Sequence, residues 1–436
     1  MKFTTLLDVS VVAHEADDDI NVLLDLEAPT APETVRAHAN TLQVVLDRSG
    51  SMAGGPLRGA VDALVTMVGR LDSRDRFGVV VFDDEAQVVV PCGPLVDKAA
   101  VVDGLRSIRP GGSTDLGAGY LRGLRELRRG SAASGPSGAP NAPVGGTLLV
   151  ISDGHVNCGI TDVDSFADLA SKAHGGGVVT STLGYGLGYD ETLLTAIARS
   201  GAGNHEFAQD PDAAGAAIAS EVDGLLNKVV QAASLTLRFS PDVQMVKLYN
   251  ELPAHQVGDG EVVVELGDLY AQEARKLLIR FRVPAMAALG LAQVATLELR
   301  YVEVPALVEQ LVILPVTVNV VPGDEAAGRV ANPVVRSELL YQEAQQSKKQ
   351  ASEAFERGDL DVGKQLLQVA TSDLDLASAS APEEQRVDIA REVEEVKSMY
   401  RDVDQVGTNH MSKHTRASWY RQSSKRGRRR PSSEDS

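Results

Sequence analysis

The stretch TLQVVLDRSGSM at residues 41–52 joins a strand-like segment to a polar loop. Residues 41–46 are mostly aliphatic and lack the polar–apolar alternation of a half-exposed strand, which is typical of a strand covered on both faces in a parallel sheet. Asp47, Ser49 and Ser51 then follow at alternate positions. The stretch predicts a buried strand whose carboxyl end presents three oxygen-bearing side chains.

The sequence downstream alternates between strand-like and helix-like segments. In residues 56–71, for example, apolar side chains recur at helical spacing on one face. We expect further strands at residues 77–82, 86–90, 147–152 and 178–183, and further helices at residues 116–129, 163–174, 191–200 and 212–229. This alternation predicts an α/β fold with a doubly wound parallel sheet over residues 40–230.

The flanking sequence predicts two other kinds of structure. Residues 232–322 contain six β-rich segments separated by turn residues, which favours an antiparallel sandwich. Residues 1–36 hold two more strands, at 3–13 and 20–26, and we expect them to complete that sandwich. The doubly wound domain would then be inserted within the sandwich.

The C-terminal part is expected to be helical and then disordered. Residues 332–402 have helical patterns that predict a helical hairpin or bundle. Residues 403–436 are polar and basic, which predicts a disordered tail. The basic run KRGRRR at residues 425–430 is expected to be solvent-exposed. The alternative is that it binds RNA, anionic lipid or an acidic partner electrostatically.

Bulk composition excludes several function classes. The chain of 436 residues has a net charge of −18, which argues against nucleic acid as the main partner. Two cysteines cannot form a disulfide framework, and no apolar run has the length of a signal peptide or a membrane span. These features predict a cytoplasmic protein.

Two more loops carry oxygen ligands beside predicted strand and helix ends. Thr114 precedes the helix expected at residues 116–129, and Asp153 follows the strand expected at residues 147–152. Ligands of doubly wound sheets bind beyond the carboxyl ends of the strands. We therefore expect Thr114 and Asp153 to share one site with Asp47, Ser49 and Ser51.

This set of five residues resembles the metal-ion-dependent adhesion site of von Willebrand factor A (VWA) domains. The resemblance covers about residues 40–230 and implies a divalent metal, Mg²⁺ first, with Mn²⁺ or Ca²⁺ as alternatives. It implies that the three hydroxyls of Ser49, Ser51 and Thr114 bind the ion directly, while Asp47 and Asp153 act through water. A metal held this way captures an Asp or Glu carboxylate of a protein partner.

The resemblance extends to the architecture and to the class of function. A sandwich with an inserted VWA domain resembles inter-alpha-trypsin inhibitor heavy-chain-like proteins and bacterial cytosolic VWA proteins. It implies a non-enzymatic adaptor for protein–protein interaction. A co-factor of an AAA+ ATPase of the MoxR or chelatase type, or of a stress-response system, is the alternative, and a metal-dependent hydrolase is a weaker one.

Simpler interpretations of the same residues remain open. Asp47 and Ser51 could cap a helix and Asp153 could occupy a turn, or the site could exist without ever binding metal. His155 and Cys158 could contribute to a soft-metal site, although no second Cys/His pair supports zinc. The glycine-rich segments match neither nucleotide-binding fingerprint, so no nucleotide cofactor is expected.

Overall fold

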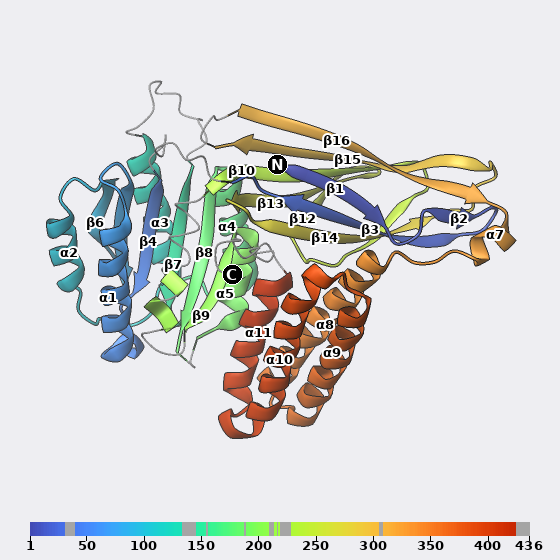
Figure 1. The fold of residues 1–436 in the computed structure, drawn as a ribbon. Coiled ribbons are helices and arrows are strands. Elements are labelled where there is room, and N and C mark those ends of the chain that lie inside the picture. The colour runs from blue at the N-terminus through green and yellow to red at the C-terminus, as the bar shows by residue number, and fades with distance from the viewer. Residues whose placement is uncertain are drawn as a thin grey trace. The chain divides into compact units, whose positions relative to one another are not determined.

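The computed structural model describes residues 1–30, 40–132, 145–153, 156–186, 189–208, 213–215, 217–218, 228–304 and 308–423. The chain divides into two compact units (Figure 1). One unit, Pro32–Lys228, is here called the α/β unit. The other joins Met1–Ala31 to Val229–Ser436 and is called the sandwich unit. The α/β unit is thus inserted in the sequence of the sandwich unit, and the predicted fold class is confirmed.

A six-stranded sheet forms the centre of the described α/β unit. Its order is β6-β5-β4-β7-β8-β9. The neighbours of β4 (Thr41–Asp47) are β5 (Arg76–Phe82) and β7 (Gly146–Ser152), both parallel to it. The chain first adds strands on one side of β4 and then crosses to the other side with β7, so the strand order reverses between β4 and β7.

The outer strands of this sheet modify the predicted pattern. The edge strand β6 (Ala86–Pro94) runs antiparallel to β5, so the sheet is mixed rather than wholly parallel. Beyond β8 (Val178–Tyr185), the sequence predicted no strand after the helix at residues 191–200, yet β9 (Ala202–Ala208) pairs in parallel with β8. Its sequence AGNHEFA is polar and contains glycine, which conceals a strand from pattern analysis. A Cβ on Gly203 would lie 1.9 Å from the carbonyl oxygen of Thr180, so only glycine allows this close approach.

Helices cover both faces of the sheet. A short 3₁₀ turn, η1 (Gly50–Met52), connects β4 to α1 (Gly55–Arg70), which packs with α2 (Lys98–Arg106) on one face. The other face carries α3 (Leu116–Ala132), α4 (Val163–Gly175) and α5 (Glu191–Ser200). Because both faces are covered, β4, β7 and β8 are buried along their entire lengths. The rigid sheet fixes the loops at its carboxyl edge.

Two sheets, antiparallel except for the pairing of β2 with β16, form the sandwich of the other unit. One has the order β1-β3-β14-β11, and its central strands are β3 (Asp18–Glu27) and β14 (Ala274–Val283). The second has the order β12-β13-β10-β15-β16-β2. Apolar side chains from both sheets, such as Leu24, Phe281, Leu237 and Leu297, form one core between them. The remaining bounds are β1 (Lys2–Leu7), β2 (Val11–Ala13), β10 (Lys228–Phe239), β11 (Gln244–Leu248), β12 (Ala254–Gly258), β13 (Glu261–Tyr270), β15 (Gly290–Glu303) and β16 (Val308–Val321).

The N-terminal segment is shared between the two sheets. The strand predicted over residues 3–13 is divided: β1 pairs with β3 in one sheet, whereas β2 pairs in parallel with β16 in the other. Asp8, in the bend between them, accepts hydrogen bonds from the backbone N–H groups of Val9 and Asn21. The N-terminal strands therefore complete the sandwich, as predicted, and they also connect its two sheets.

Four long helices follow the sandwich and the short helix α7 (Gly323–Ala327) in the described chain. They are α8 (Pro333–Glu356), α9 (Leu360–Ser380), α10 (Glu383–Val406) and α11 (Thr408–Ser423), drawn as a bundle in Figure 1. The prediction of a disordered tail from residue 403 is wrong as far as residue 423, because α10 extends to Val406 and α11 is largely buried. Residues 424–436 lie outside the described residues.

Polar contacts dominate the docking of α11, which explains the error. Met411 of α11 belongs to the apolar core of the bundle, and Trp419 and Tyr420 are also buried. Lys348, wholly buried on α8, donates to the Ser418 hydroxyl at 2.7 Å and pairs with Glu392 of α10. The Ser352 hydroxyl donates to the backbone carbonyl of Ser412 at 2.9 Å. A helix held mainly by such contacts lacks the apolar stripe that sequence analysis detects.

None of the helices in the described ranges combines the length and apolar character that crossing a membrane requires.

Candidate metal centre

Three loops meet at the carboxyl edge of the sheet, where the strand order reverses. The loop after β4 contacts the loop before α3 through two backbone hydrogen bonds: Gly50 N–H donates to the Gly112 carbonyl at 2.9 Å, and Gly111 N–H donates to the Arg48 carbonyl at 2.6 Å. The third loop follows β7, which is paired with β4. These contacts bring the segments that carry the five predicted residues together at the position where doubly wound sheets bind ligands.

Asp47 is the buried anchor of this site. It is fully buried at the end of β4, where its carboxylate accepts from the backbone N–H of Ser49 at 2.8 Å and from the Ser152 hydroxyl at 2.6 Å. Burial raises the pKa of Asp47 to about 6; the hydrogen bonds from Ser152 and Ser49 lower it, and the charge of Asp153 raises it further. A carboxylate held at such an electrostatic disadvantage is stabilised when a cation binds beside it.

The hydroxyls of Ser49 and Ser51 have the spacing of two metal ligands. Their Oγ atoms are 3.1 Å apart. Adjacent ligands of an octahedral Mg²⁺, with Mg–O bonds of about 2.0–2.1 Å, are separated by about 3 Å. The carboxylate of Asp47 holds the intervening backbone through its hydrogen bond to Ser49 N–H. The two hydroxyls therefore fit two neighbouring positions around a hard cation.

Thr114 is fixed by the loop that follows β7. Its backbone N–H donates to Asn157 Oδ1 at 2.9 Å, and its carbonyl accepts from the N–H of Asn157 at 3.2 Å. Thr114 is buried, as is Asp153, and Asp153 directly follows β7, the neighbour of β4 in the sheet. All of the contributing groups are hydroxyl and carboxylate oxygens, which suits Mg²⁺, Mn²⁺ or Ca²⁺ and not a soft metal.

An ion pair beneath the loops supports the site. Arg48 Nε lies 2.9 Å from Asp83 Oδ2, and Asp83 follows β5 directly. Burial acts to raise the pKa of Asp83, but the backbone N–H of Glu85 and the Arg48 guanidinium outweigh it and hold that pKa below its ordinary value. A Cβ on Gly111 would lie 1.8 Å from Asp83 Oδ2, so glycine is required for the loops to approach this closely.

Two further residues hold the site in place, Ser152 and Asn157, and neither was predicted from the sequence. Their roles depend on the pairing of β4 with β7 and on the contact between two loops, neither of which a motif encodes. Of the alternative soft-metal pair, His155 lies outside the described residues. Burial raises the pKa of the Cys158 thiol, and the charges of Asp115 and Asp84 raise it further, so the metal-free chain holds Cys158 mainly as the thiol at pH 7. Among the described residues, no three His, Cys, Asp or Glu side chains gather as a metal cluster.

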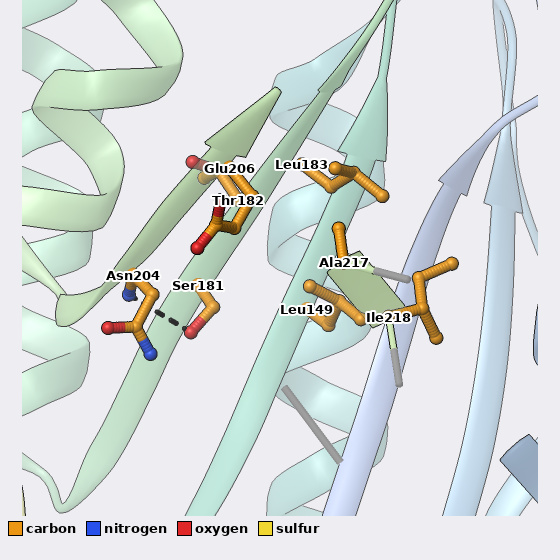
Figure 2. A pocket seen from close by; sticks show the side chains of 8 residues that line it. All are labelled: Leu149, Ser181, Thr182, Leu183, Asn204, Glu206, Ala217 and Ile218. Atoms are coloured by element: carbon orange, nitrogen blue, oxygen red, sulfur yellow. Dashed lines mark hydrogen bonds between the residues drawn. The ribbon is translucent and has the colours of Figure 1, made fainter. Parts of the chain in front are cut away.

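A small cavity elsewhere in the α/β unit has a different character. It lies between β8, β9 and the helical residues 217–218, and has a volume of about 10 Å³, the space of one water molecule (Figure 2). The backbone N–H of Asn204 donates to the Ser181 hydroxyl at 3.1 Å beside it. A cavity of this size cannot hold an organic substrate. Its lining residues are Leu149, Ser181, Thr182, Leu183, Asn204, Glu206, Ala217 and Ile218.

Residues 42–219 match the family model of the von Willebrand factor type A domain. The fold, the strand order and the three loops where the strand order reverses agree with that match, so residues 42–219 are similar to a VWA domain. It is 26% identical over 298 residues to the uncharacterized protein sll0103 of Synechocystis sp., a match that covers 62% of this chain and 67% of that protein.

One further relative and one solved structure extend the comparison. The chain is 24% identical over 242 residues to inter-alpha-trypsin inhibitor heavy chain H1 of Mesocricetus auratus, covering 54% of this chain but only 25% of the heavy chain. A solved structure described as von Willebrand factor type A from Catenulispora acidiphila superposes with a TM-score of 0.72 at 18% identity, covering 98% of this chain and 97% of that one. The expected relationship to bacterial VWA proteins and heavy chains is therefore found.

Proposed function

We propose that this protein is an adaptor whose VWA domain binds a divalent cation, Mg²⁺ first, and captures an Asp or Glu carboxylate of a protein partner through it. The proposed metal residues are Asp47, Ser49, Ser51, Thr114 and Asp153. The observation that best supports this proposal is that the hydroxyls of Ser49 and Ser51 are 3.1 Å apart, next to the buried residue Asp47. The match of residues 42–219 to the VWA family model supports protein interaction as the class of function.

The charge balance favours carboxylate capture. Hydroxyl ligands are neutral, so the positive charge of the ion is balanced by Asp47 and Asp153, which would act through water. An ion with neutral direct ligands stays electrophilic towards an incoming carboxylate, which can complete the octahedron. We propose that the site therefore acts as a binding device and not as a catalyst.

The sandwich and the helical bundle would provide the assembly platform. The two are in contact within the sandwich unit: Leu23 of β3, Leu278 of β14 and Tyr249, which follows β11, pack with Val335 of α8. Lys349 of α8 also pairs with Glu251 at 2.8 Å. Such contacts would hold the bundle as a fixed extension of the sandwich, suited to display a second binding surface.

The proposal also includes the cytoplasm as the compartment in which the protein acts. Two free cysteines, Cys92 and Cys158, are compatible with the reducing cytoplasm that we propose as the site of action. The AAA+ ATPase partner implied by resemblance stays a prediction, as does the bacterial origin. Affinity capture from the source cell would test both.

The test separates metal binding from partner binding. Titration calorimetry of the purified chain with Mg²⁺ is expected to show one site that is lost in Ser49→Ala. Ser73→Ala is the matched control, because Ser73 is an exposed serine that precedes β5, at the opposite edge of the sheet. Partners captured in Mg²⁺ and released by EDTA would support the proposal. Partners retained equally in EDTA would exclude metal-dependent capture, and Mg²⁺-dependent turnover of a phosphate or peptide substrate would favour the hydrolase.

A further inference from the structure

Acidic side chains surround the proposed metal site. Asp84 is exposed and Asp115 is partly exposed; together they are here called the acidic rim. A Cβ on Gly112 would lie 2.7 Å from Asp84 Oδ1, which places Asp84 against the loop that carries Thr114. Asp115 follows Thr114 directly and accepts from the backbone N–H of Ala118 at 2.8 Å. Both carboxylates also act on the thiol of Cys158 in the third loop.

Among the described residues, no ion pair joins a basic side chain to Asp84 or Asp115. Arg48 is engaged with Asp83 at 2.9 Å. Arg109, which follows α2, donates to the backbone carbonyls of Arg106 and Ile108, at 2.7 and 2.9 Å. An isolated acidic peptide would therefore be attracted by the ion but repelled by the rim. The structure favours a carboxylate that arrives with positive charge beside it.

A segment of this chain has that chemistry. Residues 425–435, KRGRRRPSSED, contain five basic side chains followed by Glu434 and Asp435. We propose that this segment of a second copy of the chain is a ligand of the metal site, with Glu434 or Asp435 at the ion and the basic run over the acidic rim. This inference rests on the proposed function, since it names a partner for the same site.

The spacing within the segment suits this arrangement. Arg430 precedes Glu434 by four residues, about 13 Å of extended chain. The basic run would therefore lie over the loops that surround the ion and not at the ion itself. Pro431, between the basic and acidic residues, disfavours a helix that would fold them together.

The point from which the segment departs is fixed. At the end of α11, the Ser423 carbonyl accepts from Asn250 Nδ2 at 3.3 Å, and Gln422 Oε1 accepts from the Tyr341 hydroxyl at 2.9 Å. The ligand segment thus follows one folded unit, whereas the metal site belongs to the other. If the segment of one copy binds the site of the next, the contact between copies is head-to-tail, and it propagates or closes into a ring.

A labelled peptide provides the first test. A peptide of residues 424–436 with an amidated C-terminus is titrated into the chain truncated after Ser423, and fluorescence anisotropy is read in Mg²⁺ and in EDTA. We expect binding at least tenfold weaker in EDTA, and similarly weaker for a peptide carrying Glu434→Gln and Asp435→Asn. Replacing the arginines with glutamine should weaken binding and reduce its salt dependence, as should Asp84→Asn in the protein.

Calorimetry with Mg²⁺ alone separates the proposed metal site from the proposed ligand segment. Failure to bind Mg²⁺ would refute the proposed function itself. Normal Mg²⁺ binding with peptide binding indifferent to EDTA and to the amide substitutions would overturn only the assignment of this ligand.

Sedimentation velocity of the full chain tests the second copy. Association that grows with protein concentration in Mg²⁺, and is lost in EDTA, on truncation and in Glu434→Gln/Asp435→Asn, is the expected result. A full chain that stays monomeric over the concentrations at which the peptide binds would contradict the head-to-tail contact.

Discussion

Replacing Asp47 by asparagine should make the metal-free protein more stable, although Asp47 lies at the centre of the site. The buried carboxyl has its pKa raised from 3.8 to about 6, so at pH 7 its ionisation disfavours the folded state by about 3 kcal/mol. Asparagine keeps the shape of the side chain: its oxygen can accept from Ser49 N–H, and its amide can donate to the Ser152 hydroxyl. We expect a gain of about 1–3 kcal/mol for Asp47→Asn.

The sign of the pH dependence follows from the same shift. The folded state holds the Asp47 proton more tightly than the unfolded chain does. The destabilisation is therefore absent below pH 4, grows between about pH 4 and pH 6, and is constant above. Bound Mg²⁺ should remove it, because the ion stabilises the ionised form. Asp47→Asn should lose both the pH dependence and the response to Mg²⁺.

Differential scanning calorimetry of the full chain in EDTA measures this effect. For a unit of this size about 1 kcal/mol corresponds to about 2–4 °C, so the transition of the α/β unit should rise by roughly 2–12 °C. Asp97→Asn is the control: Asp97 caps α2, where it accepts from Ala100 N–H at 2.9 Å, and asparagine caps equally well. A lower transition temperature for Asp47→Asn in EDTA would refute the reasoning.

Four further outcomes are expected. Mg²⁺ affinity, measured by calorimetry, should fall about tenfold per pH unit below about pH 6 as Asp47 takes up a proton; a flat profile would exclude Asp47 from the site. Ser49→Ala should weaken Mg²⁺ binding at least tenfold, and unchanged affinity would show that its hydroxyl is not a ligand. Lys348→Ala should destabilise the bundle by about 3–5 kcal/mol in urea titrations because Glu392 loses its buried partner, whereas Lys348→Met with Glu392→Leu should restore most of the loss. Trp419→Ala, which removes a buried side chain of α11, should destabilise the bundle by about 3–5 kcal/mol; no change would mean that α11 is not docked.

Elements with apolar patterns were predictable from the sequence, and those held by polar contacts were not. Strand β4 and helix α1 were expected at residues 41–46 and 56–71, close to their bounds in the structure. Strand β9 and helix α11 were missed because their buried faces contain glycine, serine and charged residues. Their positions are set by neighbours far away in the sequence, such as Thr180 beside Gly203 and Lys348 beside Ser418.

The candidate site shows the same division. Asp47, Ser49 and Ser51 were predictable because they follow a strand at fixed spacing, and Thr114 and Asp153 because they lie beside the ends of other elements. Ser152 and Asn157 were not, because the hydrogen bonds that they make exist only once β4 pairs with β7 and two loops meet. The acidic rim also escaped detection: Asp84 reads as a solvated turn until its loop lies against Gly112.

The most direct test of the metal site is a crystal of the full chain grown with Mn²⁺ and measured at the manganese absorption edge. The account predicts one anomalous peak at bonding distance from Ser49 Oγ, Ser51 Oγ and the Thr114 hydroxyl, with Asp47 and Asp153 behind it. It also predicts that the remaining position faces solvent or a carboxylate from another molecule. A peak elsewhere, or no peak while the three loops stay as described, would contradict it.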